Sequence, residues 1–251
     1  MNLVGAKHAI PQTGCETQTV NDFNAPSPGP GLHERVKLLH KYLLAGLVAA
    51  LLALAFVSIA GEVLEGDTGG FDGVVLRQAQ SLRAGHSGFV SAMRDLSGLG
   101  STVVLTVFVA LGVGYLILVS APTTAILVVV SAGSATVLVS ALKSVFNRLR
   151  PDGAFSEIIV TGLSFPSGHA TMSAAIFLTM GALLASTRHR WAERIYILFA
   201  AAVLTVLVGM SRIALGVHWA TDVLGGWAFG SAWAMVWLMV ASKSSHRDTA
   251  T

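Results

Sequence analysis

The chain has 251 residues, of which 53% are hydrophobic and 12% are charged, and its formal net charge is +3. Soluble domains carry about 25% charged residues, so this composition leaves too thin a polar surface for a soluble fold. It also argues against a disordered chain, a disulfide-rich scaffold (Cys15 is the single cysteine) and a nucleic-acid partner. The remaining class is an all-α, polytopic membrane protein of one domain.

Residues 1–34 differ in composition from the rest of the chain. They contain Pro11, Pro26, Pro28 and Pro30 among Gly, Asn and Thr, without a helical period. This composition predicts a disordered tail. A cleaved signal peptide has an apolar stretch close to the start, and this tail has none. The first membrane span is therefore the candidate for an uncleaved signal anchor.

Six apolar segments follow, each near the roughly 20 residues that a membrane-spanning helix needs. The uncharged run 96–142 is too long for one span and divides before Pro122, because proline disfavours helix in the preceding residue. In a later uncharged run, Pro166 and Gly168 delay the helix. The predicted spans lie near residues 42–60, 101–119, 123–142, 170–187, 195–211 and 223–242.

Lysine and arginine predict the orientation of the six-span domain, residues 35–243. With six spans, the tails (1–34 and 244–251) and the loop after the fourth span share one side. That side is predicted to be cytoplasmic because it holds Arg35, Lys37, Lys41, Arg188, Arg190, Arg194, Lys243 and Arg247. The outer face nevertheless carries Lys143, Arg148, Arg150 and Arg212. These four cations need an explanation other than topology.

The first outer segment, residues 61–100, is predicted to contain a short amphipathic helix at the membrane surface. Its apolar residues fall at helical spacing: Phe71, Val74, Val75, Ala79 and Leu82. The stretch Gly85-His86-Ser87-Gly88 is predicted to end this helix. Two interpretations remain open, a cover or lipid entrance beside a site and a connector that packs on the bundle.

The third span ends in a segment with two spaced cations. Lys143 and Arg150 are seven residues apart, about two helical turns, so they can share one side of a helix end. Two cations without acids nearby indicate an anionic ligand. The alternative is that both side chains reach lipid head groups, and Arg148, between them, is interpreted in that way.

The fourth span opens with Pro166-Ser167-Gly168-His169. Proline fixes the chain before the helix, Ser167 can cap it, and Gly168 lets an anion approach the backbone N–H groups. Because a helix N-terminus favours anions, His169 would lie beside a bound anion. The alternative is an ordinary hydrogen-bonded histidine at the membrane surface.

The fifth span leads into His218 and Asp222, four residues apart and able to hydrogen-bond on one helix face. A carboxylate on one imidazole nitrogen fixes the tautomer and leaves the other nitrogen as a nucleophile. A carboxylate at the head of an uncharged span is costly and indicates function. The alternative is an Arg212–Asp222 ion pair that joins two helices.

All three motifs lie on the same outer face in the six-span topology. They bring together three cations, two histidines, a carboxylate and a helix N-terminus. Convergent titratable groups of this kind indicate a functional site rather than three separate structural features.

The three motifs resemble those of the type 2 phosphatidic acid phosphatases, which share an active site with vanadium haloperoxidases. The family pattern is Lys, six residues, Arg-Pro; then Pro-Ser-Gly-His; then Ser-Arg, five residues, His, three residues, Asp. This chain has Lys143…Arg150-Pro151, Pro166-Ser167-Gly168-His169 and Ser211-Arg212…His218…Asp222. All eleven fixed positions match, and the resemblance covers about residues 100–241.

The resemblance implies a role for each motif residue. His218 would attack phosphorus and form a phosphohistidine, Asp222 would orient it, and His169 would be the general acid and then the base. The phosphate oxygens would be held by Lys143, Arg150, Ser167, Gly168 and Arg212. The family needs no metal and no cofactor, and the acidic residues here do not cluster as a magnesium site would require. Glu157, in the intervening loop, is interpreted as solvated.

The membrane spans favour the lipid-phosphate branch of the family. Candidate substrates are phosphatidate, phosphatidylglycerol phosphate and undecaprenyl diphosphate, hydrolysed at the outer face of a bacterial plasma membrane. The alternatives are a vanadate-dependent haloperoxidase, a lipid phosphotransferase without hydrolysis, and a non-catalytic lipid-binding or transport protein. Oligomeric state stays open, because Gly226 to Gly230 is typical of close helix packing within a bundle or between subunits.

Overall fold

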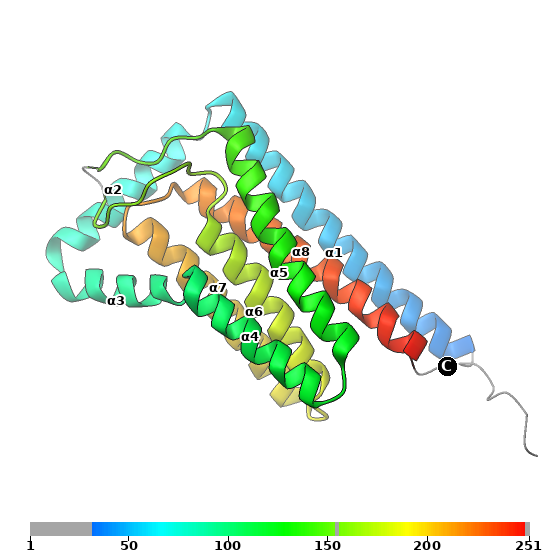
Figure 1. Ribbon diagram of the computed structural model, residues 1–251. Coiled ribbons are helices and arrows are strands. Elements are labelled where there is room, and N and C mark those ends of the chain that lie inside the picture. The colour runs from blue at the N-terminus through cyan, green and yellow to red at the C-terminus, as the bar shows by residue number, and fades with distance from the viewer. Residues whose placement is uncertain (1–31, 154–155, 249–251) are drawn as a thin grey trace, which may run out of the picture. The chain divides into compact units, whose positions relative to one another are not determined.

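The computed structural model describes residues 32–153 and 156–248, which contain eight helices and no strand (Figure 1). The chain divides into two units, residues 1–39 and residues 40–251. Of the first unit, only the beginning of the first helix is described. The helices are α1 (Leu32–Glu65), α2 (Gly69–Gly85), α3 (Ser87–Gly98), α4 (Thr102–Leu118), α5 (Pro122–Phe146), α6 (Gly168–Ser186), α7 (Trp191–Ala214) and α8 (Ala220–Asp248).

Five of the described helices, α1 and α5 to α8, are long and apolar enough to cross a membrane by themselves. α4 has only 17 residues and reaches the required length together with α3, which it meets at a bend of 42°. Counting that bent pair as one span gives six. The predictions of an all-helical membrane bundle and of an integral membrane protein are therefore confirmed.

A side-chain contact shows that the start of the first span and the end of the last span lie at the same end of the bundle. The Ser242 hydroxyl donates to the Tyr42 phenol oxygen, Oη, at 3.2 Å, near the end of α8 and the start of α1. An even number of crossings requires this arrangement. Both helices extend past the predicted spans, so residues 32–34 are helical, and α8 continues to Asp248. The remainder of the predicted disordered tail lies outside the described residues.

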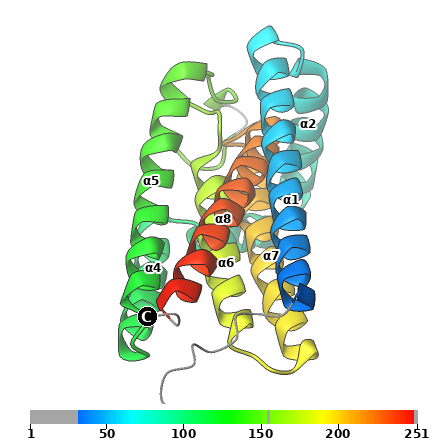
Figure 2. The ribbon, with the colours of Figure 1, turned by 90° about the vertical axis from the view of Figure 1, so that its right-hand side faces the viewer.

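α6 lies inside the helical bundle, packed against α7 and α8 (Figure 2). Glycines on α8 allow this close approach. A Cβ atom at Gly230 would collide with the carbonyl oxygen of Thr171, and one at Gly226 would lie 3.0 Å from the carbonyl oxygen of Ser167. The stretch from Gly226 to Gly230 therefore serves packing within the bundle.

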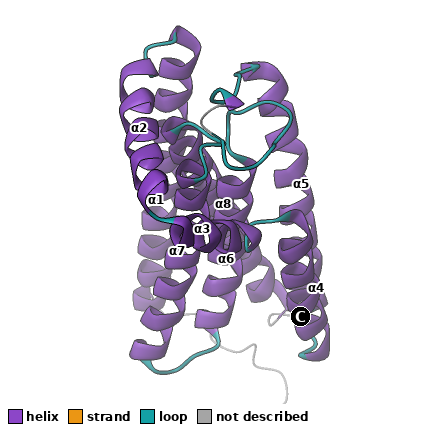
Figure 3. Cartoon of the chain, turned by 90° about the vertical axis from the view of Figure 1, so that its left-hand side faces the viewer, coloured by secondary structure: helices purple, strands orange, loops and turns teal. Residues whose placement is uncertain are grey.

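α2 and α3 connect α1 to α4 (Figure 3). α2 was expected from its amphipathic pattern, and His86 caps its end, within the predicted stop. It packs against α7 and α8, which favours the interpretation as a connector. Its buried face includes two charged residues, Asp72 and Arg83, while Phe71 and Leu82 are exposed.

α5 and α7 end, and α6 and α8 begin, at the end of the bundle where the loop between α5 and α6 lies (Figure 2). α5 ends at Asn147, whose φ of 45° turns the chain into this loop. Backbone hydrogen bonds then fix the loop: Ser164 donates to Arg148, and Ser167 at the start of α6 donates to Asp222 in α8. These contacts bring the three motifs together.

Candidate active site

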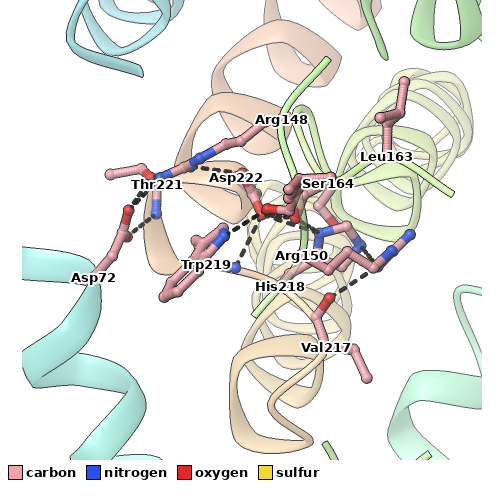
Figure 4. A network of polar contacts seen from close by, with 12 residues as sticks. Asp72, Arg148, Arg150, Leu163, Ser164, Val217, His218, Trp219, Thr221 and Asp222 are labelled. Atoms are coloured by element: carbon pink, nitrogen blue, oxygen red, sulfur yellow. Dashed lines mark hydrogen bonds and ion pairs between the residues drawn. The ribbon is translucent and has the colours of Figure 1, made fainter. Parts of the chain in front are cut away.

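His218 lies in the turn between α7 and α8 and is only 1% exposed. Its Nδ1 atom is 3.2 Å from Asp222 Oδ2, and its Nε2 atom is 2.9 Å from Arg150 Nη1 (Figure 4). A guanidinium group only donates, so Nε2 accepts this bond and Nδ1 carries the proton directed at Asp222. The lone pair is therefore on Nε2, the nitrogen remote from the carboxylate.

Asp222 is fully buried and hydrogen-bonded at both oxygens. Oδ1 accepts from Arg148 Nη1 at 2.7 Å, and Oδ2 accepts from the Trp219 backbone N–H at 2.9 Å and from the Ser164 hydroxyl. Asp222 is the third residue of α8, so its contact with Trp219 is one half of a capping box. The same carboxylate thus begins α8 and orients His218.

Two of the predicted phosphate-binding cations, Lys143 and Arg150, converge on the loop before α6. Lys143 Nζ donates to the Leu163 carbonyl oxygen at 2.6 Å. Arg150 donates from Nε to Gly162 at 3.0 Å and from Nη1 to Val217 at 2.8 Å. Arg150 is thereby held against the imidazole of His218, and Lys143 interacts electrostatically with Arg150 and Asp222.

Arg212 and Ser167 supply buried polar atoms with unused hydrogen-bonding capacity. Arg212 donates from Nη1 to Ser97 at 2.5 Å, and it does not form the predicted alternative pair with Asp222, whose ion pair is with Arg148. Arg212 Nε and Ser167 Oγ are buried without a partner. Ser167 stands at the N-cap of α6 but makes no capping bond. Unsatisfied buried groups beside a helix N-terminus suit an anion.

His169 lies in the first turn of α6 and completes the group. Its imidazole interacts electrostatically with Arg212, His218, Arg150 and Lys143. Gly100, before α4, permits this placement, because a Cβ there would lie 3.2 Å from His169 Cδ2 and collide with Val208. The structure therefore gathers all eight predicted site residues: Lys143, Arg150, Ser167, Gly168, His169, Arg212, His218 and Asp222.

The protonation of His218 is set mainly by its burial. Loss of solvent lowers its pKa from 6.5 to about 4, although the hydrogen bond and charge of Asp222 act in the opposite direction. Burial also lowers the pKa of the Arg150 guanidinium, which still remains a cation at neutral pH. A neutral imidazole beside a cationic guanidinium is the pairing that an attack on a phosphate anion requires.

Two interpretations made from the sequence are wrong. Arg148 does not face head groups, because its side chain is 15% exposed and pairs with Asp222 and with Asp72 of α2. Glu157 is not simply solvated, because its carboxylate lies 3.3 Å from Arg83 Nε. Ser164, which donates to Asp222, was not anticipated at all. Only the position of Arg148, inside the first motif and two residues before Arg150, signalled its proximity to the site.

A cavity of about 300 Å³ adjoins this group of residues. Its lining includes Arg150, Glu157, Ile158 and Val217. Over residues 32–153 and 156–248, no three His, Cys, Asp or Glu side chains are arranged to hold a metal ion. Apart from the Asp222 carboxylate, the polar side chains gathered at the site are cations, a serine and histidines, a set suited to an anionic ligand.

Comparison with known proteins places these motifs in a family. A model of the PAP2 superfamily matches residues 124–245. That segment contains all three motifs, so the resemblance to the PAP2 superfamily is confirmed over this part of the chain. It is 26% identical to the protein in a crystal structure described as the first transmembrane PAP2 type phosphatidylglycerolphosphate phosphatase from Bacillus subtilis. That similarity has a TM-score of 0.71 and covers 78% of this chain and 96% of the other.

Sequence relatives are named phosphatases. Phosphatidylglycerophosphatase B of Bacillus subtilis (strain 168) is 38% identical over 104 residues, covering 39% of this chain and 48% of that protein. Undecaprenyl-diphosphatase of Sulfolobus acidocaldarius is 35% identical over 111 residues (42% and 50%), and lipid A 1-phosphatase of Rhizobium johnstonii is 31% identical over 115 residues (42% and 43%). The chain thus spans about half the length of the curated relatives it matches.

The lowered pKa of His218 gives a testable pH dependence. Because the folded-state pKa is about 4, the neutral imidazole persists above that pH and is lost only as the pH falls through it. We therefore expect kcat/KM for phosphate release to fall on the acid side only near pH 4. The measured profile is first corrected for the ionisation of the substrate phosphate, whose second pKa is about 6. An acidic limb at the ordinary histidine pKa would contradict a neutral imidazole of His218 in the buried site.

Proposed function

We propose that this protein is an integral membrane phosphatase that hydrolyses a phosphomonoester or diphosphate on a lipid. The observation that carries the proposal is the His218–Asp222 pair, with the accepting Nε2 next to Arg150. Phosphoryl transfer depends mainly on positioning and on charge stabilisation. A buried nucleophile surrounded by cations supplies both.

The first chemical step would be an attack by His218 Nε2 on phosphorus. The N–P bond forms as the P–O bond to the lipid breaks, and the electron pair of that bond moves to the lipid oxygen. His169 gives its proton to this oxygen, so the lipid leaves as an alcohol, or as a lipid monophosphate when the substrate is a diphosphate. The cationic phosphohistidine is stabilised by Asp222 through Nδ1–H, as the charge partner of a nucleophilic histidine should do.

The second step would regenerate the enzyme with water. His169, now neutral, takes a proton from water while the water oxygen attacks phosphorus. The P–N bond breaks, its electron pair returns to Nε2, and inorganic phosphate leaves. Arg150 donates to Nε2 between turnovers, so this contact has to open for the attack. Arg150 would then donate to the phosphate oxygens instead, together with Lys143 and Arg212.

A lipid substrate is supported by the membrane spans and by the names of the relatives. The site lies at helix ends, where a phosphate can remain in the aqueous interface while acyl or isoprenoid tails stay between apolar helices. Phosphatidate, phosphatidylglycerol phosphate and undecaprenyl diphosphate are the candidate substrates. By the distribution of Lys and Arg, the site would face the outside of a bacterial plasma membrane, with both termini in the cytoplasm.

The substrate class can be tested with the full chain purified in detergent. Phosphate release would be measured on those three lipids and on glycerol 3-phosphate, a soluble phosphomonoester, each with and without EDTA. We expect release from at least one lipid, with little from glycerol 3-phosphate and no loss in EDTA. Release confined to the soluble ester would contradict lipid specificity. Activity lost in EDTA and restored by Mg²⁺ would contradict the metal-free mechanism.

A further inference from the structure

Arg148 joins three parts of the fold at one guanidinium group. Nη1 donates to Asp222 Oδ1 at 2.7 Å and to the Thr221 hydroxyl at 2.7 Å, both in α8. Nη2 donates to Asp72 Oδ2 at 2.7 Å and to the Thr68 hydroxyl at 2.6 Å, at the start of α2 (Figure 4). Two terminal nitrogens carry four N–H groups, and these four contacts occupy all of them.

Arg148 therefore differs from the phosphate-binding cations. Arg212 has a buried Nε without a partner, whereas both terminal nitrogens of Arg148 already bind protein oxygens. The guanidinium carbon also lies 5.6 Å from the centre of the Trp219 ring, which restrains it further. A side chain held in this way is suited to orient other protein groups, not to bind phosphate.

Asp72 holds the other side of the same arrangement. Its carboxylate is 1% exposed, and besides Arg148 it accepts from the Thr221 backbone N–H at 2.9 Å and from the Thr221 hydroxyl at 2.7 Å. Asp72 thus fixes both the guanidinium and the first turn of α8, which carries Asp222. A buried charge left without its partner is costly, so the two carboxylates and the arginine depend on one another.

We propose that Asp72 and Arg148 are positioning residues, which couple α2 to the nucleophile by holding the Asp222 carboxylate against His218. This inference rests on the proposed function, since it assigns them a task only if His218 attacks phosphorus. Neither residue touches the reacting atoms. α2, a connector by its packing, would on this account also be needed for full catalytic rate.

The test compares Asp72→Asn with a charge-matched control, Asp67→Asn. Asp67 is exposed and lies just before α2, so the control removes the same charge without touching Arg148. We expect Asp72→Asn to lower kcat about tenfold, because a small misplacement of a catalytic group has large kinetic effects. KM and inhibition by inorganic phosphate should stay within about twofold, because Lys143, Arg150 and Arg212 remain in place.

A double-mutant cycle distinguishes positioning from general loosening of the fold. Arg148→Lys keeps the positive charge but loses the planar set of N–H donors of the guanidinium. If Asp72 acts through Arg148, adding Asp72→Asn to this variant should lower kcat little further. Thermal unfolding in detergent would confirm that each variant is folded. If Asp72→Asn does not accumulate, Thr68→Val removes one acceptor of Arg148 at constant shape and should lower kcat in the same direction, with KM unchanged.

The outcomes separate this inference from the proposed function. Wild-type activity that disappears in His218→Ala, together with wild-type kcat in folded Asp72→Asn and Thr68→Val, would overturn the positioning role alone. A fall in kcat of equal size in Asp67→Asn, or additive effects in the cycle, would also overturn it. Unchanged activity in His218→Ala would instead refute the proposed function.

Discussion

Replacement of His218 by alanine is expected to reduce phosphate release by roughly 10⁴-fold or more, as the loss of a nucleophile does in enzymes that use covalent catalysis. The side chain is buried, and its Nε2 lone pair is the proposed attacking group. Substrate binding should persist, because the cations that hold the phosphate remain. The measurement is kcat for phosphate release by the purified variant.

His189→Ala is the matched control for this change, because His189 is exposed in the loop between α6 and α7. It should retain wild-type activity. Both variants should be extracted in similar amounts and unfold at similar temperatures. Phosphate release by folded His218→Ala at more than about a tenth of the wild-type rate would refute the nucleophile assignment.

Asp222→Asn should have the second largest effect. Asparagine keeps the shape but loses the charge that fixes the Nδ1–H tautomer and stabilises the cationic intermediate. It also leaves Arg148 with a neutral amide in place of an ion pair. We expect kcat to fall by about 10²- to 10⁴-fold, because neutralising the carboxylate of a catalytic histidine costs up to about 10⁴ in kcat, with a much smaller change in KM.

Asp95→Asn is the control for Asp222→Asn, since Asp95 is exposed on α3. Part of the loss in Asp222→Asn could come from destabilised packing, because Asp222 also begins α8. Thermal unfolding separates the two effects, and kcat of the folded fraction is the quantity to compare. A folded Asp222→Asn protein with kcat within about threefold of wild type would contradict the orienting role.

The spans and the motif residues could be predicted from the sequence because their signals are local. Uncharged runs long enough to cross a membrane predict the helices, and Pro122 and Pro166 mark breaks within these runs. Once six crossings are assumed, the ends of α5 and α7 and the starts of α6 and α8 must lie at the same end. Lys143, His169 and Asp222 were therefore expected to meet, as the structure places them.

The parts that were missed depend on contacts between distant segments. Asp72, Arg148 and Thr221 are separated by dozens of residues, and nothing in their local sequence states that they share one hydrogen-bonded group. α3 was also missed, although Phe89, Met93 and Leu96 fall at helical spacing, because its 12 residues are too few for a membrane span. For α2, the apolar residues suggested a surface helix, whereas its buried face turned out to include charged side chains.

Trapping of a phosphorylated protein is the most direct test of the central claim, that His218 forms a covalent bond to phosphorus. Wild-type protein would be mixed with a phosphate-labelled lipid substrate, quenched within one turnover, kept alkaline to preserve the P–N bond, and digested for mass spectrometry. We expect phosphate on the peptide that contains His218, and none in His218→Ala. Phosphate release in the first turnover with no label on His218, or with label on another residue, would contradict the mechanism.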